Sequence, residues 1–244
     1  MKELLKRSAR QAGLFVANNE RLGLDVDLDL ARLTGYAPLK TIFDVGANFG
    51  QTACRFAQAF PAASIYSFEP VQDTFAKMKA NVKRLPQVRA FQMALGDQTG
   101  TAEIHLAASA GSNSLKAVHG STASEIIQVK TLDEVADENN VETIDLLKID
   151  VEGFELQVLA GAARRLAQRR IRFIYAECVM DNDPEMAHTN FFDIHALLRP
   201  LGFSVVAYYA ESFHLRSGCA MGNTLWALRE QLPAKASGVL GNIV

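Results

Sequence analysis

Three short segments of the chain carry acidic residues at places where strands are expected to end, and the first of them also carries two glycines. They are residues 44–50, 67–70 and 148–152, and each follows a run of apolar, β-prone residues. In an open sheet of parallel strands, the carboxyl ends of the strands lie along one edge, and ligands bind at this edge. The spacing therefore predicts that the three segments meet in one binding site.

The turn at residues 44–50 has the form of a cofactor-binding turn without the residues that bind phosphate. A dinucleotide fingerprint needs glycine where this chain has Asn48, and a phosphate-binding loop needs a Lys and a Ser or Thr that the turn lacks. S-adenosylmethionine has no phosphate but carries a sulfonium, an ammonium and a carboxylate. A strand-end acid such as Asp44 suits the ammonium, and the start of the following helix suits the carboxylate. The turn thus favours S-adenosylmethionine as the cofactor.

Glu69 ends the next strand and supplies a second anchor. It follows Asp44 by about 25 residues, close to the spacing of roughly 20 residues at which an acid accepts the ribose hydroxyls of a nucleotide. Its alternative role is to cap the helix after Pro70. Residues 93–97 follow the third strand, where the adenine edge would lie. The expected cofactor contacts are Asp44, Gly46, Ala47, Asn48, Gly50, Glu69, Pro70, Ala94, Asp97 and Ser114.

The fourth strand end offers groups that could handle a methyl acceptor. Methyl transfer needs an acceptor oxygen held in line with the sulfonium methyl and a route for its proton. Lys148 and Asp150 are two residues apart and therefore on the same side of a strand, with Glu152 just beyond them. Glu177 stands at the next strand end. The catalytic candidates are accordingly Asp150, Glu152, Lys148 and Glu177.

A structural interpretation of the same residues stays open. A lysine in an apolar strand is costly to bury unless it is paired, so Lys148 could form a buried ion pair with Asp150 or Glu177. His188 and His195 are weaker candidates for a base near neutral pH. A metal could be held by Asp150, Glu177, Asp181 and Asp183, but residues 181–184 also have the composition of a turn, and we expect no metal.

The remaining pattern predicts a parallel sheet with helices on both faces, because β-rich runs alternate with helical stretches. Strands are expected at 41–45, 64–68, 88–94, 144–149 and 171–177, helices at 50–59, 71–84, 154–169 and 191–201, and a terminal strand pair at 203–209 and 223–228. Two further strands, 101–107 and 125–130, form a hairpin-like insertion around a small polar stretch that includes Ser114.

The composition of the chain limits its expected partners and location. The chain has 244 residues, 49% of them hydrophobic and 21% charged, with a formal charge of −2, so no overall field attracts nucleic acid or anionic lipid. The three cysteines form no C-x-x-C pair, which fits a reducing, cytoplasmic location without zinc. No run approaches the ~18 apolar residues of a membrane span. The basic start of the chain is interpreted as an amphipathic helix, with contact to a membrane surface as a weaker alternative.

Five segments resemble motifs of the FkbM family of methyltransferases. They are FDVGANFGQT (residues 43–52), FEP (68–70), ALGD (94–97), LKIDVEGFE (147–155) and GNTLW (222–226), and the likeness runs in order from about residue 41 to residue 229. The resemblance implies a Rossmann-like class I methyltransferase fold of the α/β class, with a mostly parallel sheet, helices on both faces and an antiparallel terminal strand pair. It also implies transfer to oxygen, often a hydroxyl of a sugar or a secondary metabolite.

The resemblance leaves the first forty residues without an inherited role. We expect an N-terminal helical extension at 1–40, the methyltransferase domain at 41–230 and a flexible tail at 231–244. The expected partners are a small-molecule or glycan acceptor and a second copy of the chain, contacted through the N-terminal segment. Two alternatives are a nicotinamide-dependent reductase, disfavoured by Asn48, and a cofactor-binding module without turnover.

Overall fold

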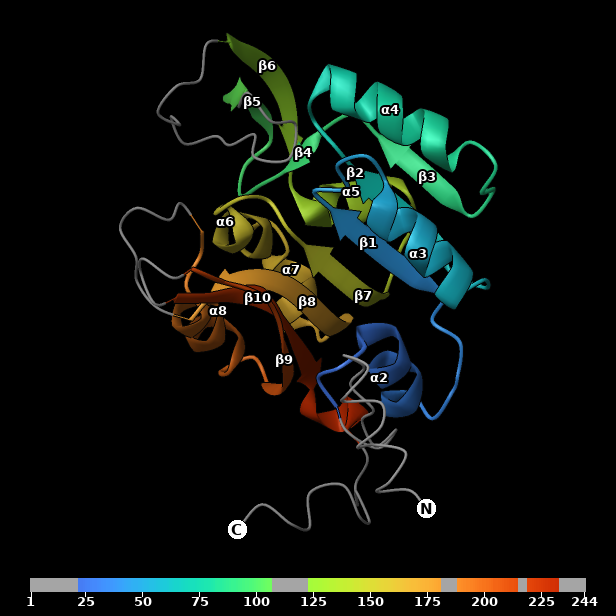
Figure 1. The fold of residues 1–244 in the computed structure, drawn as a ribbon, viewed down its shortest axis with the longest axis vertical. Helices are drawn as coiled ribbons and strands as arrows, with labels where there is room; N and C mark the ends of the chain where they lie inside the picture. Colours follow the sequence, from blue (N-terminus) through green and yellow to red (C-terminus); the bar gives the residue numbers. More distant parts are fainter. Residues whose placement is uncertain (1–21, 107–122, 181–187, 215–218, 233–244) are drawn as a thin grey trace, which may run out of the picture.

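A computed structural model describes residues 22–106, 123–180, 188–214 and 219–232. Seven strands form its central sheet in the order β3-β2-β1-β7-β8-β10-β9 (Figure 1). The strands are β1 (Thr41–Val45), β2 (Ser64–Phe68), β3 (Val88–Phe91), β7 (Ile144–Ile149), β8 (Ile171–Val179), β9 (Phe203–His214) and β10 (Cys219–Leu228). All neighbours from β3 to β8 are parallel, whereas β10 runs antiparallel to β8 and β9. The predicted terminal strand pair is thereby confirmed.

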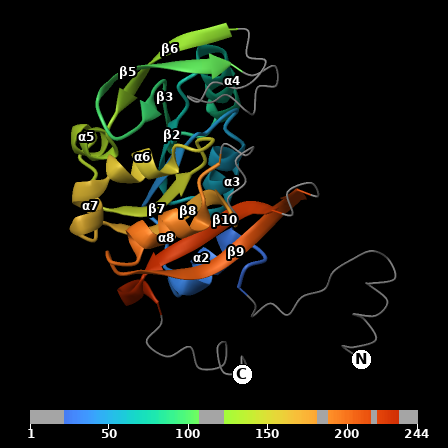
Figure 2. The same cartoon turned by 90° about the vertical axis from the view of Figure 1, so that its left-hand side faces the viewer.

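Helices cover both faces of this sheet (Figure 2). One face carries α2 (Val26–Leu33), α3 (Gln51–Ala59) and α4 (Gln72–Val82), and the other carries α5 (Leu132–Glu138), α6 (Glu155–Ala160), α7 (Ala163–Ala167) and α8 (Phe191–Leu198). Strand β7 lies between the two layers and is buried at every position. A strand covered on both faces needs apolar residues throughout, which is why Asp145 and Lys148 stand out in its sequence.

A second, three-stranded sheet lies beside the central one, in the order β4-β6-β5. It comprises β4 (Ala94–Leu95), β5 (Gly100–Leu106) and β6 (Ala123–Lys130). Strands β5 and β6 are antiparallel, as the predicted hairpin requires. The prediction of one strand over 88–94 is wrong, because the chain leaves the central sheet after Phe91 and Ala94 pairs with Val129 of the small sheet.

The predicted helix at 154–169 is two helices, α6 and α7, which meet at Gly161. A Cβ atom at Gly161 would lie 2.0 Å from the carbonyl oxygen of Gly96, so the glycine permits the turn after β4 to approach. The carbonyl oxygen of Gly161 accepts the backbone N–H of Asp133 at 3.0 Å instead of continuing a helix. A contact between segments, and not a local signal, therefore divides this helix.

The described part of the N-terminal segment packs on the domain through α2. Val26 and Leu30 are buried in the same apolar cluster as Phe56 of α3. The Tyr209 hydroxyl of β9 donates to Asp29 of α2 at 2.7 Å, and the Asp29 side chain is almost fully buried. Within the described residues, no helix has both the length and the apolar character needed to cross a membrane.

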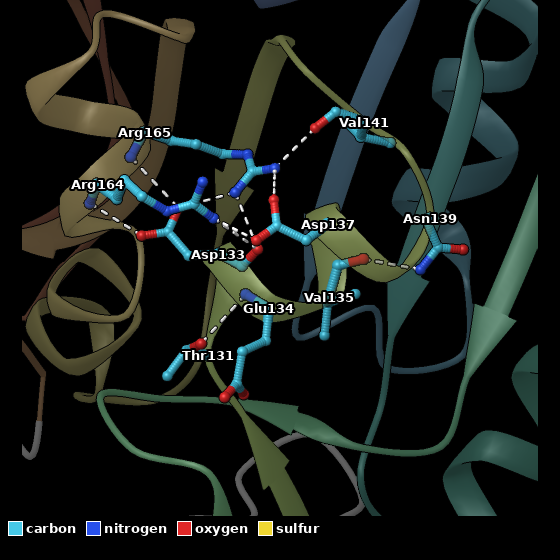
Figure 3. A network of polar contacts seen from close by, with 9 residues as sticks. All are labelled: Thr131, Asp133, Glu134, Val135, Asp137, Asn139, Val141, Arg164 and Arg165. Atoms are coloured by element: carbon cyan, nitrogen blue, oxygen red, sulfur yellow. Dashed lines mark hydrogen bonds and ion pairs between the residues drawn. The ribbon is translucent and has the colours of Figure 1, made fainter.

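A buried arginine joins α5 to α7 (Figure 3). Arg165 is 4% exposed, and its guanidinium donates to the carbonyl and carboxylate oxygens of Asp133 at 2.9 and 3.0 Å. It also donates to the Asp137 carboxylate and the Val141 carbonyl, both at 2.8 Å. One side chain thus satisfies acceptors along the whole of α5 and its exit.

Replacing Arg165 with Met should lower the free energy of unfolding by about 3 kcal/mol, because the buried acceptors lose their donors. Arg164→Met is the matched control, since that side chain is half exposed and its pair with Asp137 contributes less than about 1 kcal/mol. Denaturant unfolding measures both. Equal losses in the two variants would contradict the role assigned to Arg165.

Candidate active site

The turn after β1 is built so that three strand ends converge. The backbone N–H groups of Gly46 and Ala47 donate to the Phe68 carbonyl at the end of β2, at 3.1 and 2.9 Å. Gly46 has φ 74°, and a Cβ there would lie 1.8 Å from the Asp150 carbonyl oxygen after β7. Only glycine combines this left-handed backbone with so close an approach. The turn therefore sits directly against the ends of both neighbouring strands.

Asn48 completes the turn in the left-handed region, with φ 49°. Asparagine tolerates this conformation better than other residues with a Cβ, which explains its presence where a dinucleotide site would have glycine. Its backbone N–H donates to a carboxylate oxygen of Glu69 at 3.1 Å. Its side-chain oxygen is buried and has no hydrogen-bond partner among the described residues, so it is available to a ligand.

The Glu69 carboxylate accepts hydrogen bonds from two segments, the turn after β1 and the start of α4. One oxygen accepts the Asn48 N–H and the other accepts the Val71 N–H, at 2.9 Å, where α4 begins. Burial of the carboxylate raises the pKa of Glu69 to about 7 against these two hydrogen bonds. Glu69 therefore fixes the residue that precedes α4 and also faces the site. The first N–H of α4, that of Gln72, is bound by Glu125, so the alternative capping role falls to Glu125 instead.

Lys148 lies beneath the turn and is 4% exposed. Its ammonium group donates to the Gly46 carbonyl at 2.8 Å and lies 3.3 Å from Asp44 and 3.4 Å from Asp150. Burial lowers the pKa of Lys148, but the two carboxylates outweigh burial and raise it above its ordinary value. The pairing predicted with Asp150 is present. Glu177 is not the other partner, because register on the adjacent strand places Asp44 opposite Lys148.

The loop after β7 is shaped by Glu155, which is not among the predicted site residues. Glu152 and Gly153 both have a left-handed backbone, with φ 53° and 94°. The buried Glu155 carboxylate accepts the N–H groups of Val151 and Gly153 at 3.1 and 3.3 Å, and it also accepts the Thr189 hydroxyl. Its position two residues after Gly153 is the sequence feature that could have indicated this role. Glu155 thus positions the loop that carries Glu152.

Three titratable groups gather where this loop meets the end of β8. The Nδ1 atom of His188 lies 3.4 Å from Glu177 and 3.9 Å from Glu152. Burial, then the neighbouring Glu177, raises the pKa of Glu152 to about 7, and burial also raises that of Glu177. Pairing with Glu177 raises the pKa of His188. The weak histidine candidate thus lies beside two predicted catalytic acids. His195 stacks on Phe191 instead.

These elements enclose a cavity of about 300 Å³. The strand ends and loops of the central sheet form one side, and Ile104 and Ile127 of the small sheet form the other. Its charged lining consists of four carboxylates with no lysine or arginine among the described lining residues. The predicted site residues that it brings together are Gly46, Asn48, Glu69, Pro70, Ala94, Asp150, Glu152 and Glu177.

The other predicted site residues lie elsewhere. Asp44 is fully buried beside Lys148, so both support the turn from below. The amide of Ala47 bonds to β2, and Gly50 packs against α4 near Met78. Asp97 is exposed in the turn after β4 and does not line the cavity. Ser114 lies outside the described residues.

The cavity fits S-adenosylmethionine better than a phosphate-bearing cofactor. Four carboxylates around a space of this kind repel phosphate and attract the sulfonium and ammonium groups of the cofactor. The Asn48 side-chain oxygen, which has no hydrogen-bond partner in the described part of the chain, and the Glu69 carboxylate supply acceptors for its hydroxyl and amino groups. Together with the sheet order, in which the final pair of strands is antiparallel, this site defines a Rossmann-like class I methyltransferase that uses S-adenosylmethionine.

The chain belongs to the FkbM family of methyltransferases. The family model described as the methyltransferase FkbM domain matches residues 44–205, from the cofactor turn into β9. The matched range includes all three strand-end segments from which the site is built. The nicotinamide-dependent reductase considered from the sequence is therefore set aside.

The chain is similar to several named methyltransferases. The 2-O-methyltransferase NoeI of Sinorhizobium fredii is 31% identical over 57% of this chain and 63% of NoeI. The 31-O-demethyl-FK506 methyltransferase FkbM of Streptomyces tacrolimicus is 31% identical over 70% of this chain and 75% of that protein. The hexuronic acid methyltransferase AglP of Haloferax volcanii is 29% identical over 59% of this chain and 58% of AglP. The alignment thus spans less than two thirds of NoeI and AglP.

Among solved structures, M. capricolum TrmK, in complex with the cofactor product S-adenosyl-homocysteine, has 10% sequence identity and a TM-score of 0.48. The likeness covers 82% of this chain and 68% of that chain.

Proposed function

We propose that this enzyme transfers the methyl group of S-adenosylmethionine to a hydroxyl of a sugar or glycan. The main support for this proposal is that Glu152 and Glu177 line the same cavity as the cofactor turn. Carboxylates accept hydrogen bonds from hydroxyl groups and can therefore orient an alcohol for attack. The relatives support this acceptor class, because a hexuronic acid and a 2-O position are named for two of them.

We assign the cofactor to the half of the cavity formed by the ends of β1 and β2. Glu69 accepts the ribose hydroxyls, and the turn with Asn48 holds the amino-acid end. Asp150, whose side chain is 38% exposed, faces the positive end of the cofactor while it remains paired with Lys148. Lys148 and Asp44 are buried below this surface and are positioning residues in the proposal.

The proposed reaction is a direct displacement. The acceptor oxygen attacks the methyl carbon, the new oxygen–carbon bond forms as the sulfur–carbon bond breaks, and the sulfonium becomes the neutral thioether of S-adenosylhomocysteine. The hydroxyl proton passes to solvent water in the same turnover. Glu152 and Glu177 hold the hydroxyl in line, so positioning supplies most of the acceleration.

A product assay tests the proposal. Sugars and glycans with free hydroxyls are incubated with the protein and cofactor labelled in its methyl group, and mass spectrometry locates the label. A methyl ether with an equal amount of S-adenosylhomocysteine is the expected result. Tight binding of S-adenosylhomocysteine without turnover on any hydroxyl would instead support the alternative of a cofactor-binding module.

Affinity for S-adenosylhomocysteine should fall about tenfold between pH 8 and pH 6. The pKa of Glu69 is about 7, and the ribose hydroxyls need its ionised form. Below this pKa the carboxylate must lose a proton before it can accept them, so the affinity falls as the pH falls. Isothermal titration calorimetry measures the dependence. Glu69→Gln should bind more weakly with a flat profile, and Glu152→Gln should retain the slope. A sloping Glu69→Gln profile would contradict the assignment.

Nucleic acid is not a proposed acceptor, because a cavity lined by four carboxylates repels a phosphate backbone. A homodimer through the N-terminal segment is supported by the exposure of Leu24 and Tyr36 next to α2. A cytoplasmic location is supported by the free thiols of Cys54 and Cys178.

A further inference from the structure

The cluster of Glu152, Glu177 and His188 has the composition of a metal site, and neither the family match nor the relatives assign it one. The three residues come from the loop after β7, the end of β8 and the segment before α8. Each offers a ligand atom, and these atoms all lie within 4.8 Å of one another. Three elements thus bring two carboxylate oxygens and an imidazole nitrogen to one point.

The position of the His188 nitrogen supports this interpretation. Its Nδ1 atom is shielded from solvent and forms no well-oriented hydrogen bond with the described residues, and it faces the carboxylates of Glu177, at 3.4 Å, and Glu152, at 3.9 Å. The pair with Glu177 needs a proton on the imidazole, and a divalent cation would take the place of that proton. Ligand atoms around an octahedral cation are about 3 Å apart, so shifts of less than about 1 Å would bring these atoms to bonding positions.

We propose that Glu152, Glu177 and His188 bind a divalent cation of the Mn²⁺ class at the edge of the cofactor cavity. One imidazole and two carboxylates suit a borderline divalent ion. The charge is also appropriate, because two carboxylates face each other here and no lysine or arginine lines the cavity within the described residues. A cation with two positive charges neutralises this pair.

The site differs from the metal set considered from the sequence. Asp150 lies 3.4 Å from Lys148 and is held there by that ion pair, so it is not a ligand in the proposal. Glu177 is common to both sets. Asp181 and Asp183 lie outside the described residues. The ligands that the sequence set lacked are Glu152 and His188. His188 reaches the cluster because the segment before α8 lies beside Glu177.

The role of the cation rests on the proposed function. Three protein ligands leave coordination positions open, and Glu152 and Glu177 line the cavity in which the acceptor would lie. An acceptor hydroxyl bound to the cation becomes more acidic and releases its proton to solvent water. The resulting oxygen then forms its bond to the methyl carbon as the bond from that carbon to sulfur breaks. The cation supplies a route for the proton and a fixed position for the oxygen.

Binding of Mn²⁺ to the full chain is measured by electron paramagnetic resonance, without cofactor or acceptor, after treatment with a chelator. We expect one ion per chain, with affinity reduced at least tenfold in Glu177→Gln and in His188→Ala. Glu142→Gln, which makes the same chemical change at an exposed carboxylate paired with Arg170, should bind Mn²⁺ like the parent chain. Glu152→Gln, at a more exposed ligand, should weaken binding without affecting folding.

Calorimetry with S-adenosylhomocysteine on the same samples separates the two proposals. If the folded chain binds S-adenosylhomocysteine but no Mn²⁺, or binds Mn²⁺ equally in all variants, the cation site is wrong and the proposed function stands. If the chain binds Mn²⁺ at these ligands but not S-adenosylhomocysteine, the proposed function fails and the cation site remains.

Discussion

Gly46→Ala should abolish measurable binding of S-adenosylhomocysteine and lower methyl transfer by at least about 100-fold, since a displacement of about 1 Å at a reacting centre has an effect of this size. The added Cβ would lie 1.8 Å from the Asp150 carbonyl oxygen, which belongs to the backbone after β7. The strand ends must separate to admit it. This movement displaces both the turn that holds the cofactor and the loop that carries Glu152, and should lower the free energy of unfolding by about 3 kcal/mol.

Gly35→Ala is the matched control. Gly35 also has a left-handed backbone, with φ 62°, but no heavy atom of the described residues lies within 4 Å of the position that an added methyl group would take. The substitution therefore carries only the strain of the left-handed conformation, about 1–2 kcal/mol. Titration calorimetry and thermal unfolding measure both variants. If Gly46→Ala binds S-adenosylhomocysteine as well as Gly35→Ala does, the close contact between β1 and β7 is not what forms the site.

Lys148→Met should lower the free energy of unfolding by about 3–5 kcal/mol, because it leaves Asp44 buried without a counter-charge. Asp44 is fully buried, and Lys148 lies 3.3 Å from it. The hydrogen bond from Lys148 to the Gly46 carbonyl is lost as well, so cofactor affinity should also fall. Lys130→Met, which removes a partly exposed lysine paired with the exposed Glu138, should cost less than about 1 kcal/mol.

The pH dependence and a double variant test the mechanism of that loss. Burial raises the pKa of Asp44, and in Lys148→Met the opposing attraction is gone. A carboxyl whose pKa is higher in the folded state than in the unfolded state loses stability as the pH rises, so the variant should be less unstable at pH 5 than at pH 8. Lys148→Met with Asp44→Asn should recover part of the stability. Urea unfolding at both pH values gives the result, and no recovery would show that the ion pair is not the cause.

Much of the site was predictable because it depends on strand ends. A parallel sheet places the carboxyl ends of its strands at one edge, so the turn at 44–50, Glu69 and the segment after β7 had to meet there. The absence of phosphate-binding residues in the turn pointed to S-adenosylmethionine. The cavity, which has no lysine or arginine among its described lining residues, agrees with that prediction.

Contacts between distant segments were not predictable in the same way. The local pattern of β7 shows that Lys148 needs a partner, but the register with β1 decides that Asp44 is one of them. Asp97 lies just after β4, where the sequence predicted a cofactor contact. Because the chain leaves the central sheet for the small sheet at this point, Asp97 is exposed. Glu155 has the sequence of a helix-start acid, and its bonds to Val151 and Gly153 depend on a loop conformation that no periodicity describes.

The sequence by itself determined the fold class, the family and the edge of the sheet at which the cofactor binds. Hydrophobic periodicity and strand-end chemistry act over a few residues and can be recognised in order along the chain. Only the tertiary structure decided that Asp44 supports the turn from below and that His188 joins Glu152 and Glu177. These arrangements depend on strand register and on the path of the chain after β8, which are set by packing of the whole domain.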